Sequence, residues 1–153
     1  RNKGVIMKVV VQRCLFGSVE VDNKLVNKVD NGFVLLVGFT HNDTLEDIDY
    51  IVKKVVNLRV FDDENGVMNK SILDTKGSIL SISQFTLYAN TKKGNRPSYI
   101  DALGGEDAIK LYEIFNSKLN EHVPTYPGIF GADMKVNILN DGPITIVIVS
   151  KNK

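Results

Sequence analysis

The sequence predicts an α/β (α+β) fold: a single compact domain with a strand-rich mixed or antiparallel sheet, or partial barrel, and two helices packed on it. Three observations support this prediction. Runs of β-branched and apolar residues recur between short turns, two longer segments have helical periodicity, and 153 residues suit one domain. We expect the domain to span residues 7–153, with residues 1–6 as an N-terminal extension or a vector-derived remnant.

Composition narrows the classes of function. The apolar fraction of 43% and the charged fraction of 24% are ordinary for a globular protein. A formal net charge of +1 argues against a broad basic face that would bind duplex DNA. No apolar stretch approaches the roughly 18 residues of a membrane helix. The single cysteine, Cys14, excludes an internal disulfide and fits a reducing, cytoplasmic compartment.

The first forty residues predict a meander of three or four strands. Residues 8–13 are rich in β-branched side chains, and residues 18–29 alternate polar with apolar around Asp22-Asn23, a pair that suits a hairpin turn. Residues 33–39 form a nearly continuous apolar run, which is typical of a strand buried on both faces.

Two segments have the periodicity of amphipathic helices. The first begins near Thr44, which has the capping-box spacing to Asp47. The second spans residues 106–122 and ends before Pro124. The residues expected to face inward are Leu45, Ile48, Ile51, Val52, Val55 and Val56 in the first helix and Ala108, Leu111, Tyr112, Phe115 and Leu119 in the second.

A predicted strand over residues 78–84 ends in the first candidate site, a Ser-Gln-Phe-Thr segment that begins at Ser83. Hydroxyl groups at a strand end often satisfy only the neighbouring backbone groups. Alternatively, Ser83, Gln84, Phe85 and Thr86 line a pocket. Phe85 would then be a wall, and Thr86 with local N–H groups would donate to a developing oxyanion.

The second candidate site is the Asn-Asp-Gly-Pro segment at residues 140–143, between predicted strands over residues 134–139 and 144–149. The simplest interpretation is an ordinary hairpin turn. An X-Pro bond favours trans by only about 0.5–1 kcal/mol, so a cis bond between Gly142 and Pro143 is plausible. A cis bond would turn the local carbonyl groups towards a pocket.

Two further segments are candidates for binding. Lys92, Lys93 and Arg96 form the densest basic cluster of the chain, on a polar loop. They are either a solvated surface or a phosphate contact. A glycine-rich segment after the second helix places Phe130 and Met134 among small residues, which suits a binding wall, although a loop entering a strand needs no function.

Other reactive residue types give weaker signals. His41 lies in a predicted turn and His122 at a helix end, with no nucleophile signature near either. Cys14 follows a strand-like run and is expected to be a small buried residue. The acidic turn at residues 62–66 lacks the ligand spacing of a calcium loop. We therefore expect neither a metal nor a cofactor.

Together, these segments resemble the D-aminoacyl-tRNA deacylases, formerly called D-tyrosyl-tRNA deacylases. The resemblance runs from Met7 to about Val149, and its most specific part is the pair of Ser-Gln-Phe-Thr and Asn-x-Gly-Pro motifs at this separation. It implies a hydrolase that cleaves the ester between a D-amino acid and the 3′-terminal adenosine of tRNA. It also implies a homodimer with active sites at the subunit interface.

The resemblance implies roles for individual residues. Ser83, Gln84 and Thr86 become the candidate catalytic residues, through positioning rather than as nucleophiles. A bound water, backbone oxyanion donors and the terminal ribose 2′-OH would do the chemistry without a metal. The candidate substrate-binding residues are Phe85, Phe130, Ala132, Met134 and Asn140, and the candidate phosphate contacts are Lys92, Lys93 and Arg96.

Gly142-Pro143, as a cis peptide reaching into the partner's pocket, would provide chiral selectivity. Its carbonyl groups would hold the α-amino group and fill the space that an L side chain needs. A D side chain would point to open volume, and glycyl-tRNA should pass as well. A 10⁴-fold preference corresponds to about 5.5 kcal/mol, which a clash with rigid backbone can supply.

Three alternatives stay open. A sibling class with a trans Gly-Pro acts on L-aminoacyl-tRNA, a non-catalytic module would only bind the tRNA 3′ end, and a structural dimer would use both motifs as turns. Recognition of a single-stranded tRNA end needs no large basic surface, so a net charge of +1 is compatible with tRNA and with no DNA or membrane partner.

Overall fold

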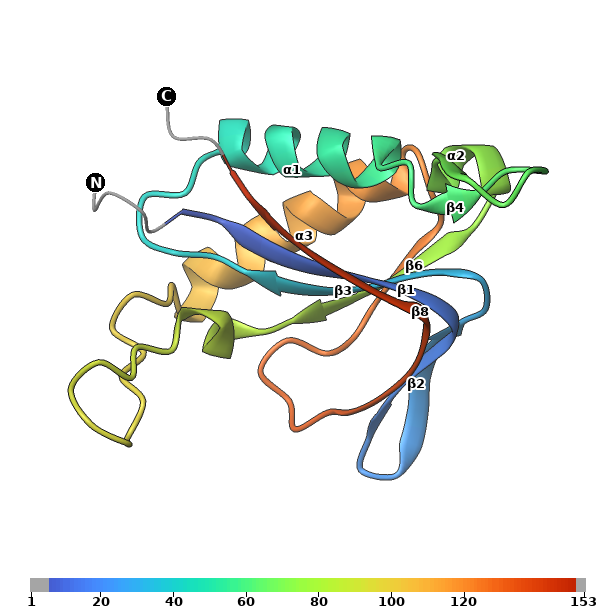
Figure 1. Cartoon of the computed structure of the whole chain (residues 1–153). Coiled ribbons are helices and arrows are strands. Elements are labelled where there is room, and N and C mark those ends of the chain that lie inside the picture. Colours follow the sequence, from blue (N-terminus) through green and yellow to red (C-terminus); the bar gives the residue numbers. More distant parts are fainter. Residues whose placement is uncertain (1–5, 151–153) are drawn as a thin grey trace.

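The computed structural model describes residues 6–150, so residues 1–5 of the predicted extension lie outside it. Its main feature is a six-stranded mixed sheet in the order β2-β1-β3-β6-β7, with β8 paired to β1. Helices α1 and α3 lie together over one side of this sheet (Figure 1).

The strands are β1 (Lys8–Val21), β2 (Lys24–Val29), β3 (Gly32–Gly38), β4 (Phe61–Asp62), β5 (Met68–Lys70), β6 (Ser78–Ser83), β7 (Thr125–Pro127) and β8 (Lys135–Val149). The helices are α1 (Leu45–Asn57), α2 (Ile72–Thr75), the 3₁₀ helix η1 (Phe85–Tyr88) and α3 (Gly105–Asn120).

Strand β1 connects the two parts of the sheet. Its first half pairs antiparallel with β3 and its second half with β2, while β8 pairs antiparallel along its other edge. Asp22 and Asn23 between β1 and β2 have φ of 51° and 64°, the left-handed conformation of a tight hairpin turn, which confirms the predicted turn. Among the described strands β8 pairs only with β1, so β8 is an edge strand.

The other half of the sheet is parallel. Strand β6 pairs parallel with β3 and with β7, and parallel neighbours need crossover connections. Helix α1 lies in the connection from β3 to β6, and α3 lies in the connection from β6 to β7. The side chain of Asn27 on β2 donates to the carbonyl of Pro127 on β7 at 2.6 Å, which brings the two outer strands together and nearly closes the sheet into a barrel.

The main core lies between the sheet and the two long helices. The inward residues predicted for α1 are buried except Leu45, which is 52% exposed because it is the first residue of the helix. In α3, Tyr112, Phe115 and Leu119 are buried as predicted, and Leu111 is partly buried against the same core. The predicted capping box is also present, since Thr44 N donates to Asp47 Oδ2 at 2.8 Å.

A second, smaller core lies on the opposite face of the sheet. Successive strand residues point to opposite faces, so Val34, Leu80 and Ile82 face away from the helices. They form a buried cluster, against which Met134 and Val136 pack. This cluster matters for function because its upper edge, Ile82 and Met134, also lines a cavity.

Residues 6–150 contain three α-helices, one more than the sequence predicts. Helix α2 is a single turn capped by Ser71, whose Oγ accepts from Asp74 N at 3.2 Å. Four residues cannot display helical periodicity, and the same limit hides the 3₁₀ helix η1. None of the helices in residues 6–150 is long and apolar enough to span a membrane.

The prediction of a hairpin turn at residues 140–143 is wrong. β8 runs through this segment without reversing: Asn140 lies opposite Cys14 of β1, and Thr145 lies opposite Gln12. Residues 141–144 therefore bulge out of a continuous strand. A turn-like composition does not reverse the chain here because β1 provides an antiparallel partner on both sides of the bulge.

Candidate functional site

A cavity of about 250 Å³ joins two of the segments proposed from the sequence. One wall comes from the end of β6 and the start of η1, and the other from the loop that enters β8. The predicted site residues that line it are Ser83, Gln84, Phe85, Phe130, Ala132 and Met134. The structure thus brings together residues nearly fifty positions apart in the chain.

The first wall is fixed by the change from strand to 3₁₀ helix. Strand β6 ends at Ser83, and the next residue, Gln84, donates its backbone N–H to the carbonyl of Val37 at 2.8 Å. Gly38 allows η1 to lie close to the end of β3. A Cβ at Gly38 would lie 2.8 Å from Tyr88 Cε2 and 3.3 Å from the Gln84 carbonyl oxygen.

Thr86 braces the wall rather than lining the cavity. Its hydroxyl oxygen accepts a hydrogen bond from the side-chain amide of Gln84, and its carbonyl accepts from Ala89 N at 3.0 Å. No carboxylate, imidazole or amine lines the cavity within the described chain. The side chains around the cavity therefore offer hydrogen bonds and packing, with no base that could activate the Thr86 hydroxyl.

The second wall is anchored to helix α3 through Tyr112. The ring of Phe130 lies 5.9 Å from that of Tyr112, centroid to centroid. The Tyr112 hydroxyl donates to the carbonyl of Ser81 in β6 at 2.6 Å, and burial raises the pKa of this tyrosine. Because one tyrosine contacts both walls, the width of the cavity depends on the packing of α3.

Phe85 stands at the rim with an aromatic partner that the sequence did not suggest. Its side chain is 54% exposed and meets Tyr99 edge to face, with ring centroids 5.0 Å apart. Tyr99 is itself 39% exposed. Phe85 begins η1 and Tyr99 lies in the loop before α3, and only the position of Tyr99 just after the basic segment could have pointed to it.

The bulge at residues 141–144 is held from within β8. Asn140 Oδ1 accepts from Ile144 N at 3.0 Å, and Asn140 Nδ2 donates to Thr145 Oγ1 at 3.0 Å. Gly142 has φ of +130°, and a Cβ there would lie 2.8 Å from Ile144 Cγ1. The peptide bond between Gly142 and Pro143 is cis. Asn140 therefore braces the bulge and does not line the cavity, where the sequence had suggested substrate binding.

Arg13 of β1 also holds the bulge, and the sequence suggested no role for it. Its side chain is only 10% exposed. Its Nε donates to the Asp141 carbonyl at 3.2 Å and lies 3.4 Å from the Asp141 carboxylate, while Nη1 donates to the Val60 carbonyl at 2.7 Å. A buried guanidinium with several fixed partners makes this part of the edge strand rigid.

The remaining candidates lie elsewhere. Cys14 is buried, and desolvation, with Asp141 and Asp30 nearby, raises the pKa of its thiol to about 11, so it stays protonated at neutral pH. His41 Nε2 lies 2.8 Å from the Ile100 carbonyl, away from the cavity. Within residues 6–150 no three His, Cys, Asp or Glu side chains come together as metal ligands.

The two motifs of the predicted site do not meet within one described chain. No residue of the bulge lines the cavity between Phe85 and Phe130. Gly142 and Pro143 are exposed at the edge of β8. The basic residues Lys92, Lys93 and Arg96 are also exposed and do not line this cavity.

Comparison with known proteins gives a consistent assignment. Residues 10–149 match the protein family described as D-Tyr-tRNA(Tyr) deacylase. A Bacteroides fragilis protein named D-aminoacyl-tRNA deacylase is 56% identical, and the match covers 96% of this chain and 99% of that protein. A Clostridium novyi protein of the same name is 54% identical, with the same coverage of both chains.

Two solved structures share the fold. One is described as the c-Myc DNA Unwinding Element Binding Protein and has a TM-score of 0.89 at 38% identity, covering 95% of this chain and 99% of its own. The other, described as a probable eukaryotic D-amino acid tRNA deacylase, has a TM-score of 0.79 at 17% identity, covers 93% and 98%, and shows the fold alone. The resemblance seen in the sequence is thus confirmed, and the chain belongs to the D-aminoacyl-tRNA deacylase family of hydrolases.

Proposed function

We propose that this chain hydrolyses the ester of D-aminoacyl-tRNA, releasing the free amino acid and tRNA, in the cytoplasm where charged tRNA is used. The observation that carries the proposal is the cavity, which unites the Ser83–Phe85 wall with the Phe130–Met134 wall in a chain of this family. A site with stacking surfaces and hydrogen-bonding groups, and without a broad basic face, suits the single-stranded end of an RNA.

The terminal adenosine would occupy the cavity. Phe130 and Met134 offer an aromatic and a thioether wall, Ala132 leaves space beside them, and Phe85 stands exposed at the rim. A cavity of about 250 Å³ is close to the lower end of ordinary ligand sites, so it suits one nucleoside rather than a longer segment. The aminoacyl ester would then extend towards Ser83 and Gln84.

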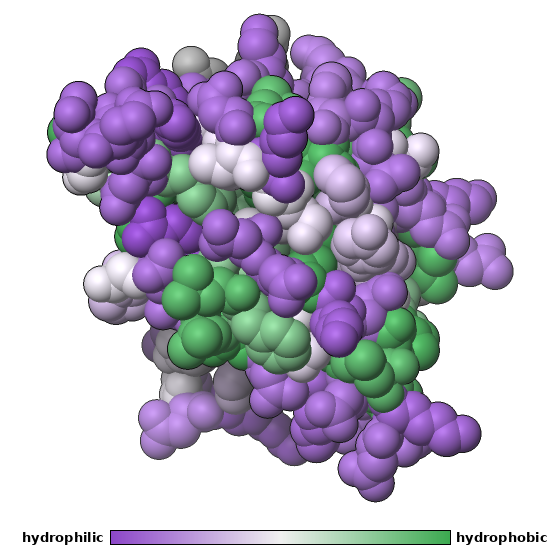
Figure 2. Space-filling model, turned by 90° about the vertical axis from the view of Figure 1, so that its right-hand side faces the viewer, coloured by the Kyte–Doolittle hydropathy of each residue, from purple (hydrophilic) through white to green (hydrophobic). Residues whose placement is uncertain are grey.

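A second copy of the chain would complete the site. β8 is an edge strand whose exposed side chains are unusually apolar: Leu139 is 56% exposed, Val147 60% and Val149 45%. Exposed apolar edges favour association. On the side where β1 and β8 bend, Figure 2 shows hydrophobic patches between hydrophilic side chains. Pairing of two copies through this region would cover the patches and bring the bulge of one copy towards the cavity of the other.

Gly142-Pro143 of the second copy would act as the chiral filter. Its backbone carbonyl groups would hold the α-amino group and leave no space for an L side chain, while D-aminoacyl and glycyl esters would fit. Rigidity is essential, because a filter that moves aside cannot exclude anything. Two hydrogen bonds support this role by holding the bulge at both ends: Arg13 Nε donates to the Asp141 carbonyl, and Asn140 Oδ1 accepts from Ile144 N.

The chemistry would need only positioning and electrostatic stabilisation. An aminoacyl ester is activated by its own α-ammonium group, so an oriented water can attack the carbonyl carbon. Backbone N–H groups at the start of η1 would stabilise the oxyanion, and the terminal ribose 2′-OH would assist proton transfer. Ser83 and Gln84 would position the ester, while Thr86 keeps Gln84 in place. This mechanism requires no metal.

The decisive experiment is hydrolysis of matched D-tyrosyl-, L-tyrosyl- and glycyl-tRNA by the purified chain. We expect rapid loss of the D and glycyl esters while the L ester persists. Cleavage of the L ester would instead indicate the sibling class of deacylase. Binding of tRNA without any hydrolysis would indicate a module that only binds the 3′ end.

A further inference from the structure

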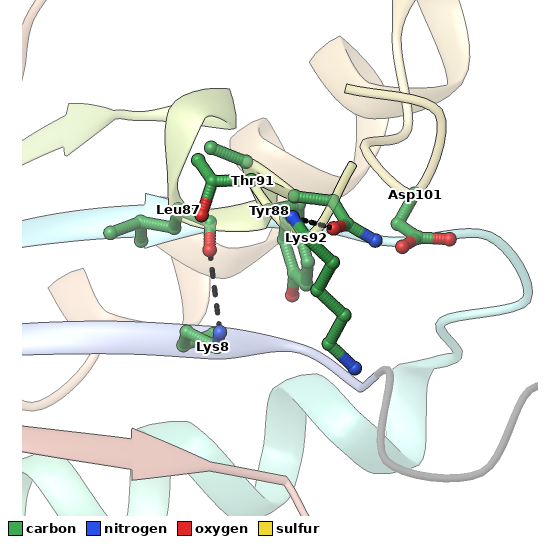
Figure 3. Close-up of a pocket in the computed structure, with 8 residues that line it drawn as sticks. Lys8, Leu87, Tyr88, Thr91, Lys92 and Asp101 are labelled. Atoms are coloured by element: carbon green, nitrogen blue, oxygen red, sulfur yellow. Dashed lines mark hydrogen bonds between the residues drawn. The ribbon is translucent and has the colours of Figure 1, made fainter. Parts of the chain in front are cut away.

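A second cavity, of about 270 Å³, lies on the other side of η1. It is formed where the start of β1 passes beneath η1 and the polar loop that follows it (Figure 3). The residues that matter here are Lys8 on β1, Leu87 and Tyr88 on η1, Lys92 on the loop, and Asp101. No role for this cavity follows from the ester-hydrolysing site described above.

Lys8 is held in place inside this cavity. Its Nζ donates to the Leu87 carbonyl at 3.3 Å and lies 5.2 Å from the centroid of the Tyr88 ring. The ring is itself fixed, because the Tyr88 hydroxyl donates to the carbonyl of Gly38 at 3.1 Å. An ammonium group has three N–H donors, and the bond to Leu87 uses one of them. Lys8 can therefore bind an anion without leaving its position.

Lys92 provides a second positive charge from the opposite wall. Its backbone N–H donates to Asn90 Oδ1 at 3.0 Å, and Asn90 and Ser98 close the base of the loop with two backbone hydrogen bonds. Figure 3 shows the Lys92 side chain extending from the loop towards the start of β1. Both ammonium groups thus lie on the β1 side of the cavity.

Asp101, the one carboxylate among the described residues that line the cavity, does not cancel this charge. Asp101 lies at the far end from Lys8 (Figure 3). Two lysines against one aspartate leave a net positive charge in an open cavity, and the neighbouring loop adds Lys93 and Arg96. Such a site favours a compact anion that also remains in contact with solvent, and a phosphodiester has these properties.

We propose that this cavity binds a backbone phosphate of the single-stranded 3′ end of tRNA, next to the cavity for the terminal adenosine. The inference rests on the proposed function. η1 is the wall shared by the two cavities: Phe85 lines one and Tyr88 the other. Three residues of a 3₁₀ helix rise by about 6 Å, comparable to one nucleotide step along an extended strand. A strand that ends beside Phe85 can thus place a preceding phosphate between Lys8 and Lys92.

The test compares kinetics on full-length D-tyrosyl-tRNA with kinetics on D-tyrosyl-adenosine, which has no phosphate. For the Lys8→Gln, Lys92→Gln double variant, we expect KM for the tRNA to rise about three- to tenfold. The negative slope of log(kcat/KM) against log[salt] should become shallower by about 0.7, because one phosphate contact is lost. KM for D-tyrosyl-adenosine should not rise, because the missing contact is to a phosphate. Lys110→Gln, which removes an exposed charge on α3, is the matched control.

Failure of this inference can be told apart from failure of the proposed function. If the unaltered chain does not hydrolyse D-tyrosyl-tRNA, the proposed function fails. If it does, and the double variant keeps the same KM and salt slope, or loses activity equally on both substrates, the phosphate site is overturned. Binding of a 3′-CCA oligonucleotide that carries no amino acid can be measured by fluorescence anisotropy, which gives a readout without catalysis. In the double variant this binding should weaken by the same factor as the rise in KM. Lys8→Arg, which keeps the charge, should restore binding.

Inorganic phosphate distinguishes an RNA site from a site for free anions. Phosphate that competes with the oligonucleotide on the unaltered chain, and less on the double variant, would support the proposal. Oligonucleotide binding that the double variant leaves unchanged, while phosphate binding is lost, would contradict it, because the cavity would then serve a free anion.

Discussion

The cavity and the bulge represent two different ways of building a site. The cavity beside Phe85 and Phe130 is assembled entirely within one chain, and both of its walls are tied to Ser81 or Val37 in the central strands. The bulge around Gly142 is equally well held, but it lies exposed on an edge strand and does not line the cavity between Phe85 and Phe130. We propose that this rigid, exposed segment acts on a second copy of the chain. Under this proposal, one chain holds all the parts of the site, and two copies are needed to bring them together.

The largest effect is expected from a substitution that prevents two copies of the chain from associating through β8. Leu139→Lys places a charge on the apolar edge of β8, and burying an unpaired charge in an interface is very costly. We expect a monomer by light scattering and activity near background, with the fold intact by circular dichroism. Leu25→Lys on β2 is the control, because Leu25 is equally exposed at 56% but lies on a different strand. A fully active Leu139→Lys monomer would show that each chain works alone.

The next largest effect is expected from a substitution in the bulge itself, at Gly142. Gly142→Ala adds a Cβ that would lie 2.8 Å from Ile144 Cγ1 and 3.0 Å from its backbone N, at a φ of +130°. The bulge must shift, and misplacement by about 1 Å can cost about 100-fold in rate, so we expect kcat/KM to fall by about that factor. Gly104→Ala is the control, because a Cβ there meets nothing within 4 Å. Unchanged rates and unchanged chirality in Gly142→Ala would refute the role of the bulge.

A milder change probes the cavity. Phe130→Ala removes the ring that would stack on the terminal adenosine. Loss of one base–aromatic contact costs about 1–3 kcal/mol, so we expect KM to rise about tenfold or more. The neighbouring Ile129→Ala should have little effect, since Ile129 is 45% exposed and does not line the cavity. Equal kinetic constants for the two variants would show that the terminal adenosine does not bind against Phe130.

The smallest effect is expected at Thr86. Its hydroxyl accepts from the Gln84 amide and has no base within the cavity lining, so Thr86→Ala should lower kcat by less than about tenfold. Steady-state kinetics on D-tyrosyl-tRNA would measure this, with Thr86→Ser as the conservative companion. Complete loss of turnover in a folded Thr86→Ala variant would make the hydroxyl a reacting group and contradict the positioning role.

Much of the fold could be predicted from local signals. Helix α1 follows from apolar periodicity and the Thr44–Asp47 cap, and the β1–β2 turn follows from Asp22-Asn23. The Ser83–Phe85 wall also followed, because a strand end is a property of neighbouring residues. These features depend on residues close in the chain, so a single sequence displays them.

Features that depend on distant residues could not be predicted. The Asn-Asp-Gly-Pro composition suggests a turn, and only the pairing with β1, whose Arg13 lies 128 residues from Asp141, shows that the chain forms a bulge in a continuous strand. Likewise, Lys8 and Leu87 lie 79 positions apart, so the second cavity leaves no local trace. The sequence indicated candidate residues for the site, but only the fold shows which of them meet.

The proposal that each site combines the bulge of one copy with the cavity of another is tested most directly by mixing two impaired variants. Gly142→Ala damages only the bulge, and Phe130→Ala damages only the cavity, so a mixed dimer would contain one site with both parts intact. After unfolding and refolding an equimolar mixture, we predict recovery of about a quarter of the unaltered activity at substrate concentrations below KM, because half of the dimers are mixed and each has one intact site. Activity that never exceeds the average of the two variants would show that each bulge serves its own chain, and would contradict the account.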